Sequence, residues 1–232
     1  MPPRTALIHQ LHVELQGIEP AIWRRIEVPA HMSLPQLHIT LQIAMGWENY
    51  HLHEFRAGGK CYGEPDPEDN HFGMEVLNQR RRKLGTLLAE GDSFEYLYDF
   101  GDGWLHTVTR EAISRPIPRK RYPVCLAGDR SAPPEDVGGP FAYQRYLEAL
   151  FDPKHPEHRF LLEWRGRFQP EAFSVAQVNR QLAAAFPARR ASAPRRRTAP
   201  LPLAPATFEE EFDVIVNSII HTGRLPKFRP RD

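Results

Sequence analysis

The stretch "YDFGDGWLH", residues 98–106, places two glycines and two aspartates between aromatic residues, which indicates a tight reversal between two strands. Glycine adopts positive φ angles at little steric cost, so a turn at 101–103 explains both glycines. On each side of the turn, alternate residues share one face, which is the period of a half-buried strand. One such set is Phe94, Tyr96, Tyr98, Trp104, His106 and Val108. The spacing therefore predicts a hairpin over residues 93–113.

The same two periods extend outward from this hairpin. Alternating residues predict strands at 7–17 and 21–29, and a second hairpin at 51–63 turns through Gly58 and Gly59. Helical spacing, with Ser33 and Ser174 each followed three residues later by glutamine, predicts capped helices. The expected helices are 33–46, 141–151, 156–166 and 174–186. These elements predict an α+β fold, with a curved, mostly antiparallel sheet of hairpins and helices packed on it.

Composition bounds the class of protein. Of 232 residues, 41% are hydrophobic and 25% charged, which is ordinary for a globular protein, and the net charge of +1 gives no overall basic field for nucleic acid. Neither a signal peptide nor a membrane-length apolar run is present. The two cysteines, Cys61 and Cys125, are therefore expected to be reduced thiols in the cytoplasm, and no membrane partner is expected.

The composition changes near residue 187. Residues 187–206 are rich in proline, alanine and arginine, which predicts a flexible linker after a domain at 1–186. Three adjacent arginines, Arg195, Arg196 and Arg197, are candidates for a weak, salt-sensitive contact with nucleic-acid phosphates, and the alternative is solvated surface charge. The last segment, 207–232, begins with an amphipathic helical pattern that needs an apolar groove, either on this chain or on a protein partner.

Two histidines and the turn residues form the first candidate site. On a strand, His51 and His53 would point to the same face, because side chains alternate. If the two predicted hairpins are neighbours, these histidines converge with Asp99, Asp102 and His106, and imidazole with carboxylate suits a divalent metal such as zinc, manganese or iron. Asp99, Asp102 and His106 are also the candidate catalytic acids and bases. The alternative is structural: the aspartates serve the turn and His106 lies in the core.

Other polar residues allow similar pairs of interpretations. Glu135 and Asp136, in the segment "PPEDVGGP", either supply oxygens to a metal or a ligand, or cap the following helix. His38 is expected to be a hydrogen-bonded core histidine, and Cys125 has no evident activating base nearby. The phosphate-binding loops of kinases, P-loop enzymes and dinucleotide-binding proteins are absent.

Several long motifs in order resemble the plasmid pRiA4b ORF-3-like family, over residues 9–186. They are "IWRRIEVP", "LQIAMGWENYHLHEF", "YDFGDGWLH", "YPVCLAGDRSAPPEDVGGPFAY" and "DPKHPEH". The resemblance implies a single α+β domain and an association with plasmids and mobile elements, and some members are labelled TnpR resolvase. It implies no established activity. No helix-turn-helix pattern of the kind that a DNA resolvase uses is visible in the sequence.

Two functions follow. The first is a binding or accessory module, associated with mobile elements, that recognises a protein or a nucleic acid. The second is a metal-dependent hydrolase, a phosphoesterase or nuclease, that uses the histidine and aspartate cluster. Elemental analysis separates them, because only the hydrolase requires a bound metal.

Overall fold

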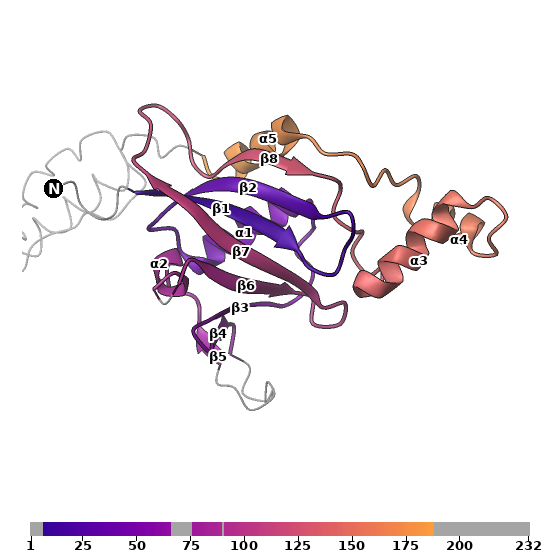
Figure 1. Ribbon diagram of the computed structural model, residues 1–232, viewed down its shortest axis with the longest axis horizontal. Coiled ribbons are helices and arrows are strands. Elements are labelled where there is room, and N and C mark those ends of the chain that lie inside the picture. The colour runs from indigo at the N-terminus through magenta and orange to yellow at the C-terminus, as the bar shows by residue number, and fades with distance from the viewer. Residues whose placement is uncertain (1–6, 66–75, 90, 188–232) are drawn as a thin grey trace, which may run out of the picture. The chain divides into compact units, whose positions relative to one another are not determined.

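The fold is an eight-stranded, mostly antiparallel open sheet with helices packed against it, as the hairpin pattern predicted (Figure 1). The computed structural model describes residues 7–65, 76–89 and 91–187. The strands are β1 (Ile8–Leu15), β2 (Ile22–Pro29), β3 (His53–Ala57), β4 (Lys60–Gly63), β5 (Val76–Asn78), β6 (Ser93–Tyr98), β7 (Trp104–Ser114) and β8 (Val124–Asp129). Their order across the sheet is β5-β4-β3-β6-β7-β1-β2-β8.

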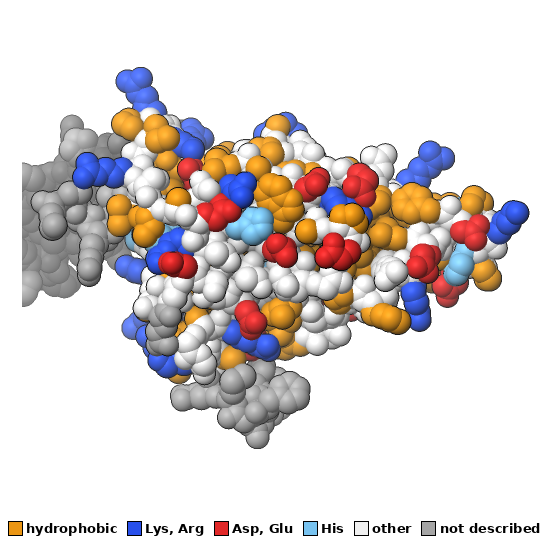
Figure 2. Space-filling model, viewed as in Figure 1, with side chains coloured by type: hydrophobic (Ala, Val, Ile, Leu, Met, Phe, Trp, Pro, Cys, Tyr) orange, Lys and Arg blue, Asp and Glu red, His pale blue; other side chains and the backbone are white. Residues whose placement is uncertain are grey.

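The sheet buries one face, and its strand alternation matches the sequence. On β1, Leu11, Val13 and Leu15 are almost fully buried, while the residues between them are partly exposed. On the opposite face, charged side chains pair across strands, as where Arg25 of β2 donates to both carboxylate oxygens of Glu111 on β7. Figure 2 shows acidic, basic and uncharged side chains intermixed on the face viewed there. A sheet with one apolar face requires helices on that face.

The helix α1 (Leu34–Met45) runs along the buried face of the sheet. Ser33 and Gln36 form the predicted capping box, in which the Ser33 hydroxyl accepts from the Gln36 amide. Gly46 ends the helix in the left-handed region at φ 89°, where a side chain would add strain. The chain then continues toward β3 through the loop that carries His51.

The buried guanidinium of Arg24 ties the end of α1 to the sheet. Arg24, on β2, is 1% exposed and donates to the carbonyl oxygens of Ala44, Trp23, Asp129 and Arg130 at 2.7–2.8 Å. Burial lowers its pKa to about 10, which still leaves it charged near neutral pH. The cation therefore lies at the C-terminal end of a helix, where the helix dipole favours positive charge.

The remaining helices are α2 (Leu84–Leu87), α3 (Gly139–Phe151), α4 (His158–Arg165) and α5 (Val175–Ala185). The last three agree with the helices expected at 141–151, 156–166 and 174–186. Helix α5 contacts β8, and its Asn179 side chain accepts from the Cys125 amide and donates to the Cys125 carbonyl. The Asn179 side chain thus hydrogen-bonds to backbone groups of an edge strand. Without it, these groups would be free to pair with another strand.

The two hairpins are neighbours in the sheet, which is the condition that the convergence of their polar residues required, because β3 pairs with β6. His53 lies opposite Tyr98 in this pairing, and His106 of β7 lies opposite Tyr96. The expectation that His51 lies on the same strand as His53 is wrong, because β3 begins at His53. His51 therefore belongs to the preceding loop, where strand alternation does not set its direction.

The linker expected at 187–206 and the helix expected within 207–232 lie outside the described residues, apart from Pro187. Arg195, Arg196 and Arg197 lie there too, so the nucleic-acid contact and the docking helix stay predictions, as does the domain boundary at 186. In the ranges that the structure describes, no helix is both long and apolar enough to cross a bilayer.

Buried histidines make the free energy of unfolding depend on pH. Burial lowers the pKa of His106 to about 4; burial, and then the neighbouring His53, lower the pKa of His38 to about 3. Both pKa values lie below the unfolded value of 6.5, so below that pH the unfolded chain binds protons that the native histidines do not. The free energy of unfolding should then fall by about 1.4 kcal/mol per pH unit for each histidine. Urea unfolding at about pH 7 and about pH 5 measures this loss, and equal stability at both values would contradict it.

Candidate functional site

The phenolic oxygen of Tyr98 fixes the loop that carries His51. Tyr98 is the last residue of β6, and its side chain is fully buried. Its oxygen accepts from the amide nitrogens of Tyr50, at 3.1 Å, and of His51, at 3.4 Å. Two consecutive loop amides that strand pairing does not satisfy are thus held by one side chain from the sheet.

The same hydroxyl donates to a buried carboxylate. Tyr98 Oη lies 2.5 Å from Oε1 of Glu135, which is 5% exposed and also accepts from the Glu48 amide at 3.2 Å. Burial and this hydrogen bond raise the pKa of Tyr98, so its hydroxyl keeps the proton that it donates. The bond joins the end of β6 to the segment before α3.

Asp99, the residue after Tyr98, forms the turn that the sequence indicated. It lies in the left-handed region at φ 56°, and its Oδ1 accepts from the amides of Gly101, at 2.9 Å, and Asp102, at 3.2 Å. A short side chain that bonds to amides two and three residues ahead stabilises such a conformation. This use occupies Oδ1, and Oδ2 faces His51 at 3.5 Å.

Asp136, the residue after Glu135, reaches the same place from a third segment. It is also left-handed, at φ 63°, and its Oδ1 lies 3.1 Å from Nε2 of His51. Arg165, in the last turn of α4, donates to the Glu135 carbonyl at 2.9 Å. The Arg165 Nη2 atom lies 3.6 Å from Asp136 Oδ2, so this cation borders the cluster.

His51, Asp99 and Asp136 therefore form a group with the composition of a metal site. One ligand atom from each lies within 4.8 Å of the other two. Around an ion with bonds of about 2.0–2.2 Å, neighbouring ligand atoms are about 3.0–3.5 Å apart, so the two distances from His51 match coordination. Solvent does not reach Nε2, and no partner in the described ranges is aligned to hydrogen-bond with it, although both carboxylates are close.

The structure does not bring His53, Asp102 or His106 into this group. His53 stacks on His38 at 3.5 Å between ring centroids, and its Nε2 lies 3.1 Å from Gln79 Oε1. His38 contacts Tyr96 and Asn49 through its two ring nitrogens and is 5% exposed, as expected of a core histidine.

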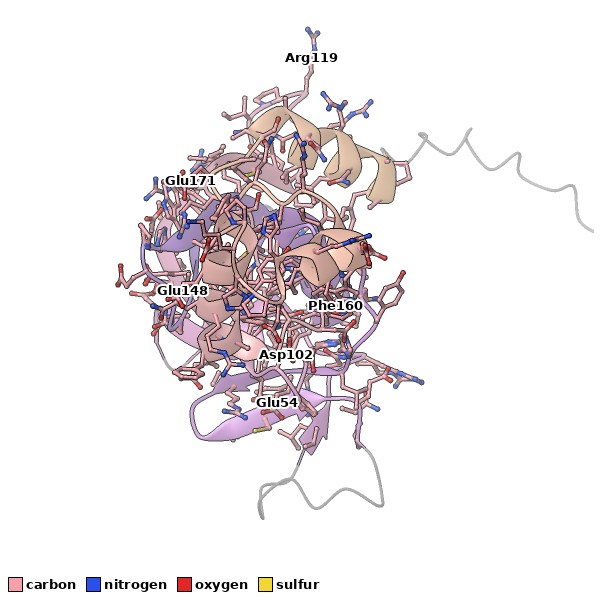
Figure 3. The ribbon with its side chains drawn as sticks, turned by 90° about the vertical axis from the view of Figure 1, so that its right-hand side faces the viewer. Glu54, Asp102, Arg119, Glu148, Phe160 and Glu171 are labelled. Carbon is pink, nitrogen blue, oxygen red and sulfur yellow. The ribbon has the colours of Figure 1, made fainter. Side chains whose placement is uncertain are left out.

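Asp102 and His106 are used by the scaffold. Oδ2 of Asp102 accepts from the Gly138 amide at 3.0 Å, where α3 begins. Figure 3 looks onto this end of the sheet, with Asp102 among the side chains near α3 and α4. His106 is 0% exposed, and its Nδ1 lies 3.1 Å from the Tyr96 carbonyl. Asp102 thus joins the turn to the start of α3, whereas the pairing of β6 with β7 places His106 in the core, away from the loops.

Sequence reasoning missed three contributors to the site. It treated Asp136 as separate from the histidines, because nothing in strand or helix periodicity indicates where a long loop returns. It assigned no role to Arg165, and it counted Tyr98 only as a buried strand residue. The one usable signal was that Tyr98 and Asp99 are adjacent, as are Glu135 and Asp136.

A cavity of about 640 Å³ lies beside the cluster. His51 lines it together with His38 and His53, and the exposed side chain of Leu52 lies on its border. His51 thus contributes to a cavity wall and to the carboxylate group at once, which places the cluster next to space that a small molecule can enter.

These residues define an α+β protein in which loops build a polar cluster at one end of the sheet. A family model described as plasmid pRiA4b ORF-3-like protein matches residues 7–177, and the chain belongs to that family. It is 41% identical over 179 residues to the uncharacterized protein y4hQ of Sinorhizobium fredii (strain NBRC 101917 / NGR234), which covers 75% of this chain and 90% of y4hQ. It is also similar to the crystal structure of MM3350, a protein of unknown function from Methanosarcina mazei Go1. That match has a TM-score of 0.66 and 35% identity, and it covers 73% of this chain and 96% of MM3350.

The role of the Tyr98 hydroxyl can be tested by Tyr98→Phe. We expect the free energy of unfolding to fall by about 2–3 kcal/mol, because two amides lose their acceptor and the buried Glu135 carboxylate loses one of its hydrogen bonds. Hydrogen exchange at the Tyr50 and His51 amides should accelerate. Tyr96→Phe is the matched control, since its hydroxyl contacts His38 and Gln42 instead. Exchange that stays slow at both amides in Tyr98→Phe would show that the loop is held by other contacts.

Proposed function

We propose that the protein binds one divalent metal ion through His51, Asp99 and Asp136 and uses it in hydrolysis. The observation that supports this most is the convergence of three ligand atoms within 4.8 Å from three segments far apart in the sequence. It favours the second of the two functions inferred from the sequence, with a different ligand set.

The ligand chemistry fits this proposal. One imidazole and two carboxylates suit a borderline or hard divalent ion such as zinc, manganese or iron. Three protein ligands leave coordination positions for water and substrate, as in catalytic rather than structural sites. An ion held there supplies Lewis acidity, which polarises a substrate oxygen or activates water.

The protein side of the site is arranged to hold such an ion. Asp99 uses Oδ1 in its turn, so the turn orients Oδ2, and the His51 backbone is held by Tyr98. Ligands that are themselves hydrogen-bonded by the scaffold lose less freedom on binding metal. Asp136, 57% exposed, is the most accessible of the three.

The same contacts also suit a purely structural arrangement in which His51 bridges the two carboxylates without any metal. Such an arrangement is a structural ion pair, and it has no need for chelatable metal. Metal binding by the protein as purified is therefore the decisive property.

A second function, partner binding, is favoured by a separate observation. Phe141 on α3 is 78% exposed and Phe160 on α4 is 65% exposed. Large aromatic side chains are enriched at the cores of protein interfaces. This supports the accessory-module function inferred from the sequence, and its link to mobile elements rests on the family resemblance.

The metal proposal predicts which substitutions abolish binding. In protein purified without an affinity tag, zinc or manganese should titrate to one ion per chain by calorimetry and elemental analysis. Asp136→Asn and His51→Ala should each weaken binding by more than about 100-fold, because ligand loss costs more than loss of an outer-shell partner. His53→Gln is the matched control and should bind metal normally.

The opposite pattern of metal binding among these variants would contradict the proposal. Loss of metal in His53→Gln, with retention in Asp136→Asn, would place the ion among the stacked histidines. No binding of either metal by the wild-type protein would leave His51 as a bridging ion-pair partner only.

A further inference from the structure

We infer that Arg165 recognises the substrate of this metal centre, and that the substrate carries a phosphoryl group held between the ion and the Arg165 guanidinium. This inference rests on the proposed function, and it goes beyond it by naming the substrate class and the residue that selects it.

Arg165 is placed beside the ligands but is not one of them. It ends α4, and its Nη2 is anchored by the Glu135 carbonyl at 2.9 Å, one residue before Asp136. The same Nη2 atom lies 3.6 Å from Oδ2 of Asp136, whereas Oδ1 of that carboxylate faces His51. The guanidinium is thus held next to the candidate ion while leaving the other carboxylate oxygen for coordination.

Most donors of this guanidinium remain available. In the described part of the chain, its Nε and Nη1 make no hydrogen bond, and its side chain is 32% exposed. The other nearby carboxylates are engaged elsewhere, because Glu135 accepts from Tyr98 and Glu48 accepts from the Tyr50 hydroxyl. A charged fork with free donors beside a coordination site is suited to an oxyanion.

The number of acceptor oxygens favours phosphoryl over carboxylate. A phosphoryl group offers oxygens to the ion and still presents two to a bidentate guanidinium. A carboxylate has only two oxygens, so contact with both the ion and the arginine gives up the bidentate geometry. Arginine is the residue that selects for such planar, paired contacts, whereas lysine acts as a point charge.

The ring of Trp164 lies against the guanidinium. Trp164 is 39% exposed, and the guanidinium carbon of Arg165 is 4.9 Å from the indole centroid. This ring shields one side of the guanidinium from water, which strengthens its contact with an anion.

The test is phosphate binding by the full-length protein, measured by calorimetry with and without manganese. The wild type should bind inorganic phosphate only when the metal is loaded. Arg165→Gln should weaken phosphate binding at least about tenfold, as expected for loss of charged hydrogen bonds, while its manganese stoichiometry stays unchanged. Arg165→Lys keeps the charge but not the planar pair of donors. Its affinity for phosphate should lie between those of the wild type and Arg165→Gln.

Arg159→Gln is the matched control, because Arg159 lies on the same helix and pairs with Glu163 at 2.9 Å instead of with the cluster. It should bind phosphate as the wild type does. Equal phosphate affinity in Arg165→Gln and the wild type would overturn the inference, as would acetate binding as tightly as phosphate. Normal manganese binding without phosphate binding removes only this inference, whereas a wild type that binds no metal removes the proposed function itself.

Discussion

The hydrogen bond between Tyr98 and Glu135 is the constraint on which the candidate site depends. Each partner is followed directly in the chain by a carboxylate of the cluster, Asp99 after Tyr98 and Asp136 after Glu135. The tyrosine oxygen also holds the amide of His51, the third member. One buried contact therefore sets the positions of three segments that local sequence does not connect. Because the contact is buried, removing the Tyr98 hydroxyl takes the acceptor from two amides and one hydrogen bond from the Glu135 carboxylate, without compensation from water.

The sheet places this hydrogen bond at the end of β6, beside the loops that carry the candidate site. Tyr98 is the last strand residue of β6, so its ring belongs to the core while the next residue already belongs to the turn. Two left-handed aspartates, Asp99 and Asp136, then change the chain direction at the rim. Such conformations are costly for residues other than glycine and persist only where surrounding contacts hold them. A rigid core edge and two constrained loops together hold the three side chains of the candidate site close to one another.

The sequence predicts the sheet well and the site only in part, for one physical reason. Alternation at Phe94, Tyr96 and Tyr98 and the serine-capped helices are local signals, and the structure confirms the elements that they predict. His51 has no such signal, because it lies outside β3, where neighbours two residues apart no longer share a face. The return of Asp136 and Arg165 depends on how long loops and α4 pack, which no period in the sequence encodes. His106, by contrast, lies in the core, in agreement with the alternation along its strand.

The most direct test is the position of a bound ion in crystals grown with manganese, located by anomalous scattering. One peak coordinated by Nε2 of His51, Oδ2 of Asp99 and a carboxylate oxygen of Asp136 is the predicted result, with the Tyr98 hydroxyl still bonded to Glu135. A peak between His38 and His53, or none within reach of His51, would contradict the account.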